Sequence, residues 1–222
     1  MITVILLDYL RHDFTQRVKD VNLNNAGHPF NLIEIDKKGI SAAINDGIFQ
    51  STDDVVTMAN DIIMPKNWLL NMVNASNAIP QSGMIGIHTV EQLPEQSNVN
   101  GIKIWETCPY GNVLITKKAI DKVGFFNLDF DPYGTQDSDY HYRCVKSGLR
   151  NYYVEGKAEH IGHDVGNGSE YRKMKDDSLF ITWKRADYWR SWYEHNGMFL
   201  NYEQESLIIN RQKYEQEQSS KS

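Results

Sequence analysis

The chain has 222 residues, of which 41% are hydrophobic, and a formal charge of −6. This length suits one compact domain with a small appendage, and the charge excludes the global basic field typical of nucleic-acid-binding domains. Two cysteines, Cys108 and Cys144, are too few for a disulfide framework and lack metal-site spacing, so we expect a reducing, cytoplasmic location. Residues 1–8 have no basic start and no cleavage signal, and no apolar run reaches membrane-spanning length, so we expect no transmembrane segment.

The first third of the chain alternates between two kinds of pattern. Aliphatic and β-branched runs predict strands, and amphipathic or capped segments predict helices, in this order: strand 3–7, helix 13–24, strand 30–35, helix 41–48, strand 53–58 and helix 65–75. Ser41 is the expected cap of the second helix. The alternation predicts an α/β fold with right-handed crossovers, and the unbroken apolar run 3–7 suits a strand buried in a mostly parallel sheet.

Polar residues follow each of these three strands: Asp8 and Tyr9, then Asp36 to Lys38, then Asn60 and Asp61. A polar residue after a strand is common, because the chain turns into solvent there. Ligands of such sheets nevertheless gather outside the carboxyl ends of the strands, so three clusters at one edge favour a small-molecule crevice.

The second half continues the same pattern with shorter elements. The expected elements are strands at 84–88, 102–105, 113–116 and 150–154, helices at 117–123 and 140–146, and loops at 91–101 and 165–171. Gly124 and Gly148 are the expected helix stops.

Residues 130–143 are the most informative stretch, because two acids lie at the start of a helix after an aromatic segment and a turn. Carboxylates of this kind meet free backbone N–H groups and the positive end of the helix dipole, which favours their ionised form. An ionised Asp137 can accept a proton from a hydroxyl group. The alternative is that Asp137 and Asp139 are ordinary helix caps.

Histidines later in the chain extend the possible chemistry. Asp61 together with His160 or His163 would suit a hard-to-borderline divalent ion. The His-x-x-His spacing alone fits a structural or exposed pair equally well.

The C-terminal region has two parts. Residues 179–193 interleave aromatic and basic side chains, a pattern that can bind a sugar or nucleic acid or can dock a helix on the domain. Residues 203–222 are polar, and we expect them to be partly disordered.

Taken in order, these features resemble the family 2 glycosyltransferases with the GT-A fold. The resemblance covers about residues 1–165, and its segments are 3–9, GISAAINDGI at 39–48, MANDIIMPKNWL at 58–69, VGFFN at 123–127, YGTQDSDYHYR at 133–143 and AEHIGH at 158–163. It implies a Rossmann-like, mostly parallel central sheet flanked by helices. It also implies a glycosyltransferase domain at 1–165, an aromatic-rich helical extension at 166–202 and a tail at 203–222.

The family's roles can be carried over residue by residue. Asp137 takes the position of the general base, which removes a proton from an acceptor hydroxyl during an inverting, in-line attack. Asp61 matches the last acid of the Asp-x-Asp motif, which holds Mn²⁺ or Mg²⁺ against the donor diphosphate, with His160 or His163 as a second ligand. The residues implied to contact the nucleotide sugar are Asp8, Tyr9, Asp36, Lys38, Asn45 and Asn60. Asp139 is expected to be structural, and Arg143 to pair with a nearby acid.

Two departures from the family pattern bear on this assignment. Ala59 stands at the first acid of Asp-x-Asp, so metal binding is weaker or depends on histidine, and Gln136 replaces the usual Glu before the base. The acceptor would be a glycan, a lipid-linked saccharide, a wall polymer or a hydroxylated DNA base, with Trp105, Tyr133 and residues 183–193 as stacking candidates or, alternatively, core residues. A non-catalytic sugar- or nucleotide-binding module is the alternative function.

Overall fold

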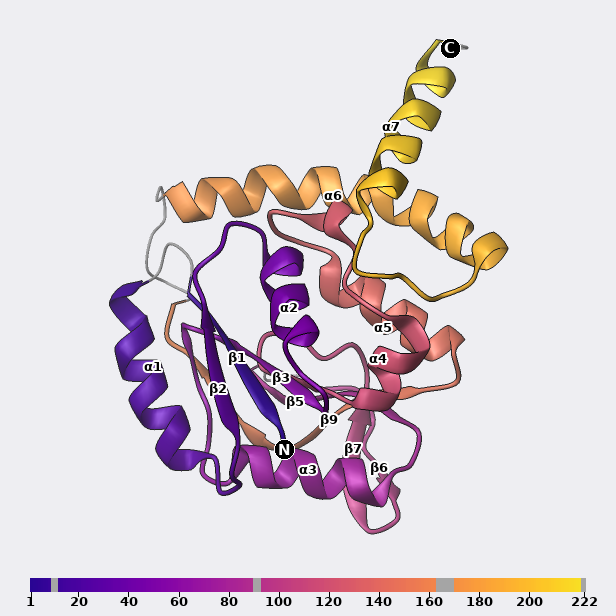
Figure 1. Ribbon diagram of the computed structural model, residues 1–222. Coiled ribbons are helices and arrows are strands. Elements are labelled where there is room, and N and C mark those ends of the chain that lie inside the picture. The colour runs from indigo at the N-terminus through magenta and orange to yellow at the C-terminus, as the bar shows by residue number, and fades with distance from the viewer. Residues whose placement is uncertain (9–11, 90–92, 163–169, 221–222) are drawn as a thin grey trace.

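The computed structural model describes residues 1–8, 12–89, 93–162 and 170–220 (Figure 1). The strands are β1 Thr3–Leu7, β2 Asn31–Ile35, β3 Val55–Ala59, β4 Ile62–Ile63, β5 Ser82–His88, β6 Ser97–Val99, β7 Ile102–Glu106, β8 Val113–Ile115, β9 Arg150–Lys157 and β10 Glu159–His160. The helices are α1 His12–Asn25, α2 Ile40–Phe49, α3 Trp68–Ala78, α4 Lys117–Val123, α5 Gln136–Lys146, α6 Glu170–Asn196 and α7 Glu205–Ser219, with a 3-10 turn, η1, at Leu128–Phe130. The first strand and the helix at 117–123 have the predicted bounds, whereas β6 forms inside the predicted loop 91–101.

The central sheet has the strand order β2-β1-β3-β8-β5-β9-β7-β6. β1 is parallel to β2 and β3, and β5 is parallel to β9, while β8 and β7 are antiparallel to each of their neighbours. Six of these eight strands therefore run in one direction, and the prediction of a mostly parallel α/β sheet is confirmed. This direction brings the carboxyl ends of β1, β2 and β3 to the same edge.

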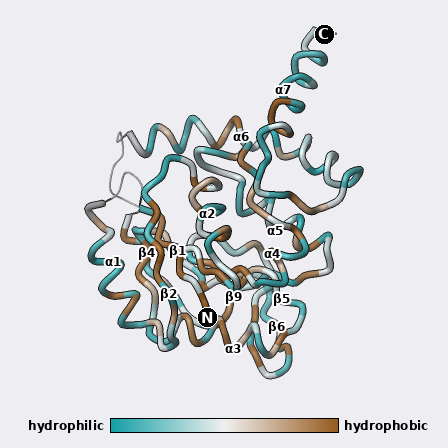
Figure 2. The backbone as a smooth tube through the Cα atoms, in the orientation of Figure 1, coloured by the Kyte–Doolittle hydropathy of each residue, from teal (hydrophilic) through white to brown (hydrophobic). Residues whose placement is uncertain are grey.

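The two faces of the sheet are covered by different helices (Figure 1). Successive strand residues point to opposite faces, so Val4 and Leu6 pack with the α3 residue Trp68 on one face, while Ile5 packs with Ile44 of α2 on the other. α4 and α5 join α2 on that second face. Hydrophobic residues are concentrated in the strands at the centre of the molecule, and the outer helices are mostly hydrophilic (Figure 2).

The C-terminal helices dock on η1. Trp189 and Tyr193 of α6 form a buried cluster with Phe130 and Leu200, which agrees with the docking alternative for residues 179–193. The sequence predicted a partly disordered tail from 203, but the structure forms α7 there, because Arg211 is buried against Asp129 and Leu207 packs on the same cluster. The end of α7 projects away from the domain (Figure 1). None of the helices in the described ranges combines the length and apolar character that crossing a membrane requires.

Candidate functional site

A crevice lies at the sheet edge where β1, β2 and β3 end. The register pairs Leu7 with both Ile35 and Ala59, so the residues that follow these strands meet at this edge. The crevice has a volume of about 80 Å³. Its lining includes Asp8, Asn60 and Asp61 from the strand ends, Gly39, Ile40 and Ala43 from the start of α2, and Pro132, Tyr133 and Met174 on the opposite side.

Asp8 and Asn60 are tied together by a residue that the sequence analysis missed. The Thr15 hydroxyl donates to Asp8 Oδ1 over 2.5 Å, and Asn60 Nδ2 lies 3.0 Å from the same oxygen and 3.1 Å from Thr15 Oγ1. These bonds fix the two crevice side chains relative to each other. Thr15 lies on α1, and a lone threonine in an amphipathic helix gives no local signal of such a contact. Tyr9 lies outside the described residues.

The segment after β2 presents Lys37 to the crevice. Lys37 lines it, whereas Asp36 and Lys38 are exposed beside it. The Lys37 ammonium group is 2.7 Å from Asp46 Oδ2 on α2. Asn45 is 1% exposed, and its amide nitrogen and oxygen both bond the backbone of Phe126, at 2.8 and 2.7 Å, so this side chain holds α2 to the loop at Phe126.

The start of α2 is capped from a distant part of the chain, not by Ser41 as the sequence predicted. Ser41 is the second residue of the helix, and its backbone N–H donates to Asp131 Oδ1 over 2.8 Å, with Ala42 N–H 3.2 Å from Asp131 Oδ2. Gly39 precedes the helix at φ 99°, and a Cβ there would lie 2.7 Å from Asp131 Oδ2. Burial raises the pKa of Asp131 to about 6, although the two N–H groups oppose that rise. The capping acid lies 90 residues away, which is why the local sequence pointed to Ser41.

Asp61, which lines the crevice, is paired with His160. β4 pairs antiparallel with β10, with His160 opposite Ile62, and this pairing brings His160 Nε2 to 3.1 Å from Asp61 Oδ2. Asn22 of α1 holds the segment that follows Asp61, because its side chain bonds the carbonyl of Ile62 and the N–H of Met64.

Asp61 and His160, which are joined by a hydrogen bond, offer the oxygen and nitrogen donors that a divalent ion takes. Two adjacent ligands of an octahedral ion at about 2.1 Å lie about 3 Å apart, which matches the observed separation. Gly162 leaves room beside the carboxylate, since a Cβ there would lie only 2.4 Å from Asp61 Oδ2. No cluster of three or more His, Cys, Asp or Glu ligands occurs within the described residues, and His163 lies outside them.

Asp137 lies in the first turn of α5 and is half-buried. Burial raises its pKa to about 7, because the hydrogen bond from Gln136 Nε2, at 3.2 Å, compensates only in part. The helix start was expected to favour the ionised form of this acid, and burial acts in the opposite direction. A pKa near 7 is nevertheless well suited to a general base at neutral pH.

Gln136 has a specific role at this position. Its Oε1 accepts from the Gly134 N–H over 2.8 Å, and its Nε2 faces the Asp137 carboxylate. A neutral amide closes the turn before α5 and also donates to the acid, whereas an ionised glutamate could close the turn but could not donate.

Tyr133 is near enough to both Asp61 and Asp137 to feel the charge of each. It lines the crevice, and burial together with the negative charges of Asp137 and Asp61 raises the pKa of its hydroxyl. Both carboxylates therefore act on one side chain between them. Lys175 of α6 lies over the Tyr133 ring, 4.7 Å from its centroid, so the first turns of α6 cover this part of the site.

Asp139 has a different environment, although it follows Asp137 by two residues. It forms a buried ion pair with Arg143 over 3.0 Å, and Arg143 also donates to the carbonyls of Val123 and Phe125. The predicted structural role of Asp139 and the predicted pairing of Arg143 are confirmed.

The aromatic residues considered for acceptor stacking divide into two groups. Trp189 and Tyr193 are fully buried, so core packing accounts for them. Trp105, half-buried, lies edge-on to His88 at a centroid distance of 6.2 Å, and Trp183 is 74% exposed on α6.

Comparison with known proteins bears on the fold. No protein-family model matches the chain, and no curated protein matches its sequence. Among solved structures, a mannosyltransferase from Pyrobaculum calidifontis in complex with GDP-Man and Mn²⁺ is similar, with a TM-score of 0.54, 15% identity, and coverage of 74% of this chain and 58% of that one.

Two structures of Drosophila β1,4-galactosyltransferase 7 are also similar. The catalytic domain in complex with xylobiose gives a TM-score of 0.53 at 12% identity and covers 80% of this chain and 79% of that one. A mutant with manganese, UDP-Gal and xylobiose gives 0.52 at 12% identity, with coverage of 79% and 74%. The chain therefore has a mixed α/β fold of the GT-A type that these glycosyltransferases share.

Proposed function

We propose that this protein is a metal-dependent, inverting glycosyltransferase that uses a nucleotide-diphosphate sugar. The proposal is supported by the Asp61–His160 pair beside the crevice and by Tyr133, a crevice residue on which the charges of Asp61 and Asp137 both act. The mannosyltransferase and the galactosyltransferase with the same fold have GDP-Man or UDP-Gal and manganese in their structures. Membership of family 2 is part of this proposal and rests on the sequence blocks.

The donor would lie along the edge formed by β1, β2 and β3. Asp8 and Asn60 line this edge as a bonded pair, Asp36 and Lys38 are exposed beside it, and Tyr9 follows Asp8. Asn45 is left out of the donor contacts, because its amide groups are used by Phe126. A cavity of about 80 Å³ is smaller than the 300–1,000 Å³ typical of ligand sites, so Tyr133 or Met174 must move when the donor binds.

The divalent ion would be held by Asp61 and His160, with oxygens of the donor diphosphate or water completing its coordination. When bound, it would neutralise charge on the leaving nucleoside diphosphate. Ala59 removes one carboxylate from the usual set, so the histidine carries more of the binding.

Asp137 would hold the proton of the acceptor hydroxyl as the oxygen attacks the anomeric carbon. Its pKa of about 7, raised by burial, lets it accept a proton at neutral pH. An attack from this side, opposite the diphosphate, inverts the anomeric centre. The acceptor classes are a glycan, a lipid-linked saccharide, a wall polymer and a hydroxylated DNA base.

A non-catalytic sugar- or nucleotide-binding module is the second candidate. Ala59 and the narrow crevice favour it, because both weaken the site for a metal-bound donor. The two candidates differ in one testable respect, because only the glycosyltransferase needs the Asp137 carboxylate.

The test replaces Asp137 with Asn and measures donor binding and transfer separately. Thermal shifts with GDP and UDP, each with and without Mn²⁺, report nucleotide binding, and labelled GDP-mannose and UDP-galactose report transfer to a panel of acceptors. We expect Asp137→Asn to reduce transfer by about 10²–10⁴-fold while leaving the nucleotide shift in place. Asp121→Asn on α4 is the matched control, because its carboxylate is exposed and pairs only with Lys117 within the described residues. Unchanged transfer in Asp137→Asn would remove the base assignment, and nucleotide binding without transfer in the wild type would favour the binding module.

A further inference from the structure

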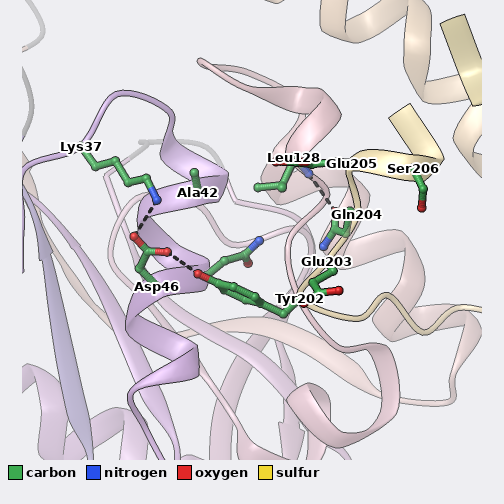
Figure 3. A pocket seen from close by; sticks show the side chains of 10 residues that line it. Lys37, Ala42, Asp46, Leu128, Tyr202, Glu203, Gln204, Glu205 and Ser206 are labelled. Carbon is green, nitrogen blue, oxygen red and sulfur yellow. Dashed lines mark hydrogen bonds and ion pairs between the residues drawn. The ribbon is translucent and has the colours of Figure 1, made fainter. Parts of the chain in front are cut away.

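A second, larger cavity lies on the outer side of α2, and we call it the α2 pocket (Figure 3). Its volume is about 530 Å³, within the range of small-molecule sites. It lies between α2, η1 and the segment that leads into α7, and its lining residues are Lys37, Ala42, Asn45, Asp46, Leu128, Tyr202, Glu203, Gln204, Glu205 and Ser206. Lys37 also lines the crevice, so the two cavities share one wall.

The floor of the α2 pocket is fixed by buried amides. Gln204 is fully buried, and its side chain accepts from the Leu128 N–H over 3.0 Å and donates to the Phe126 carbonyl over 2.8 Å. Asn45 donates to the same carbonyl. These amides are therefore used in building the pocket, and the side chains available to a ligand are those around its rim.

One rim is pre-organised by a chain of hydrogen bonds. Lys37 donates to Asp46 Oδ2 and the Tyr202 hydroxyl donates to Asp46 Oδ1, each over 2.7 Å, and Figure 3 shows both bonds. The Tyr202 ring also packs against Phe49 and Phe125, at centroid distances of 4.8 and 5.3 Å. The ring is thus held in place while remaining 37% exposed, so a ligand meets an aromatic surface that needs little ordering.

The charges on the rim restrict the ligand class. The charged side chains of the lining are three carboxylates, those of Asp46, Glu203 and Glu205, and one ammonium group, that of Lys37. The lining therefore carries a net negative charge. Phosphates and uronates are disfavoured by this field. A divalent cation is not favoured either, because the described carboxylates do not converge into a three-ligand cluster.

A neutral polyhydroxyl compound is not repelled by the negative charge of the lining and does not need a cluster of three carboxylate ligands. Carboxylate oxygens accept from sugar hydroxyls, the Ser206 hydroxyl both donates and accepts, and an aromatic ring offers its face to the C–H side of a sugar. We propose that the α2 pocket binds a neutral saccharide and is a subsite for the acceptor of the transfer reaction. The acceptor role rests on the proposed function, whereas saccharide binding stands on the pocket itself.

The test uses saturation-transfer NMR with xylobiose, mannobiose and methyl galactoside as neutral probes. Glucuronic acid and spermidine are the anionic and cationic comparisons. Ser206→Trp fills the pocket from its exposed rim, and Tyr202→Ala removes the aromatic surface as an independent variant. Ser219→Trp, at the far end of the same helix, is the matched control. Circular dichroism establishes that each variant is folded.

We expect at least one neutral probe to bind the wild type and Ser219→Trp equally, and to bind Ser206→Trp and Tyr202→Ala at least tenfold more weakly. The absence of binding by any neutral probe would overturn the proposal, as would equal binding by Ser206→Trp or a preference for glucuronic acid or spermidine. The GDP and UDP thermal shifts are measured on the same variants and should not change. If saccharides bind in the pocket but no nucleotide shift occurs in any variant, saccharide binding at the α2 pocket stands. The glycosyltransferase proposal then fails, and the acceptor role fails with it.

Discussion

Two acids in this protein, the half-buried Asp137 at the start of α5 and the buried Asp129 in η1, have different partners. Asp129 is surrounded by cations and donors from both C-terminal helices, and we call the group Asp129, Arg185, Trp189 and Arg211 the Asp129 anchor. Asp137 has the neutral amide of Gln136, and no lysine or arginine pairs with it in the ranges that the structure describes. A buried carboxylate held by several cations is committed to structure, whereas one without a cationic partner remains available for proton transfer.

The largest expected effect on stability comes from breaking the Asp129 anchor. In Asp129→Asn the guanidinium group of Arg211, whose side chain is 2% exposed, would lose its buried counter-charge and keep only Glu215, whose side chain is 50% exposed. Removing one partner of such a pair costs about 3–5 kcal/mol, so we expect a loss of about that size in the free energy of unfolding. Urea titration followed by tryptophan fluorescence measures it, because Trp189 Nε1 also donates to Asp129, over 2.8 Å.

The control for the anchor is Asp187→Asn on α6. Its carboxylate is 92% exposed and lies 3.6 Å from Arg190 of the same helix, so the change should cost well under 1 kcal/mol. If Asp129→Asn lowered the free energy of unfolding as little as Asp187→Asn, the Asp129 anchor would not hold the C-terminal helices. Asp129 would then no longer be an example of an acid committed to structure.

The second-largest effect, that of Asp137→Asn, is an increase in the free energy of unfolding and not a loss. The folded pKa of Asp137, about 7, lies above the value of about 3.9 for an unfolded aspartate, so the folded state retains the proton longer as the pH rises. Stability from this group is therefore lost between about pH 4 and pH 7. A pKa difference of about 3 corresponds to about 4 kcal/mol, and the partial exposure of the carboxylate reduces this, so we expect Asp137→Asn to raise the free energy of unfolding by about 2 kcal/mol at pH 8. The effect at pH 4 should be small, and urea titration at both pH values measures it. A destabilised variant at pH 8 would contradict the assigned pKa.

The same comparison separates what the sequence could predict from what it could not. The run 3–7 and the acids after each strand predicted the sheet edge, because strand period and chain direction are local properties. The pairing of Arg143 with Asp139 was accessible for the same reason, since residues i and i+4 share one helix face.

The features that were missed all depend on contacts between distant segments. Asp131 caps α2 from a different part of the chain, and Arg211 turns a polar tail into a docked helix by reaching Asp129. The rise in the pKa of Asp137 depends on burial by residues brought in by folding. No spacing in the sequence encodes these contacts.

A smaller effect concerns the metal side of the crevice. In Gly162→Ala the new methyl group would lie 2.4 Å from Asp61 Oδ2 and force the carboxylate away from His160. We expect about tenfold weaker Mn²⁺ binding, in line with other changes just outside a metal's ligands, as measured by the electron paramagnetic resonance signal of free Mn²⁺. Gly101→Ala, in the turn between β6 and β7, is the control: its methyl group enters open space, so it reports only the backbone strain of an alanine at φ 84°. If both variants bound Mn²⁺ with equal affinity, Asp61 would not be a metal ligand.

The smallest effect tests the neutral donor beside Asp137. In Gln136→Glu the new carboxylate can still accept from the Gly134 N–H, but it cannot donate to Asp137 and adds a like charge next to it. Both changes disfavour the ionised form of Asp137, so its pKa should rise further. We expect the rising limb of the pH profile of kcat/KM to move upward by about one pH unit or less, with the fold unchanged by circular dichroism. A shift to lower pH would mean that the group titrating in the profile is not Asp137. An unmoved profile would mean that the amide of Gln136 contributes only the turn before α5, leaving burial alone to set the proton affinity of the base.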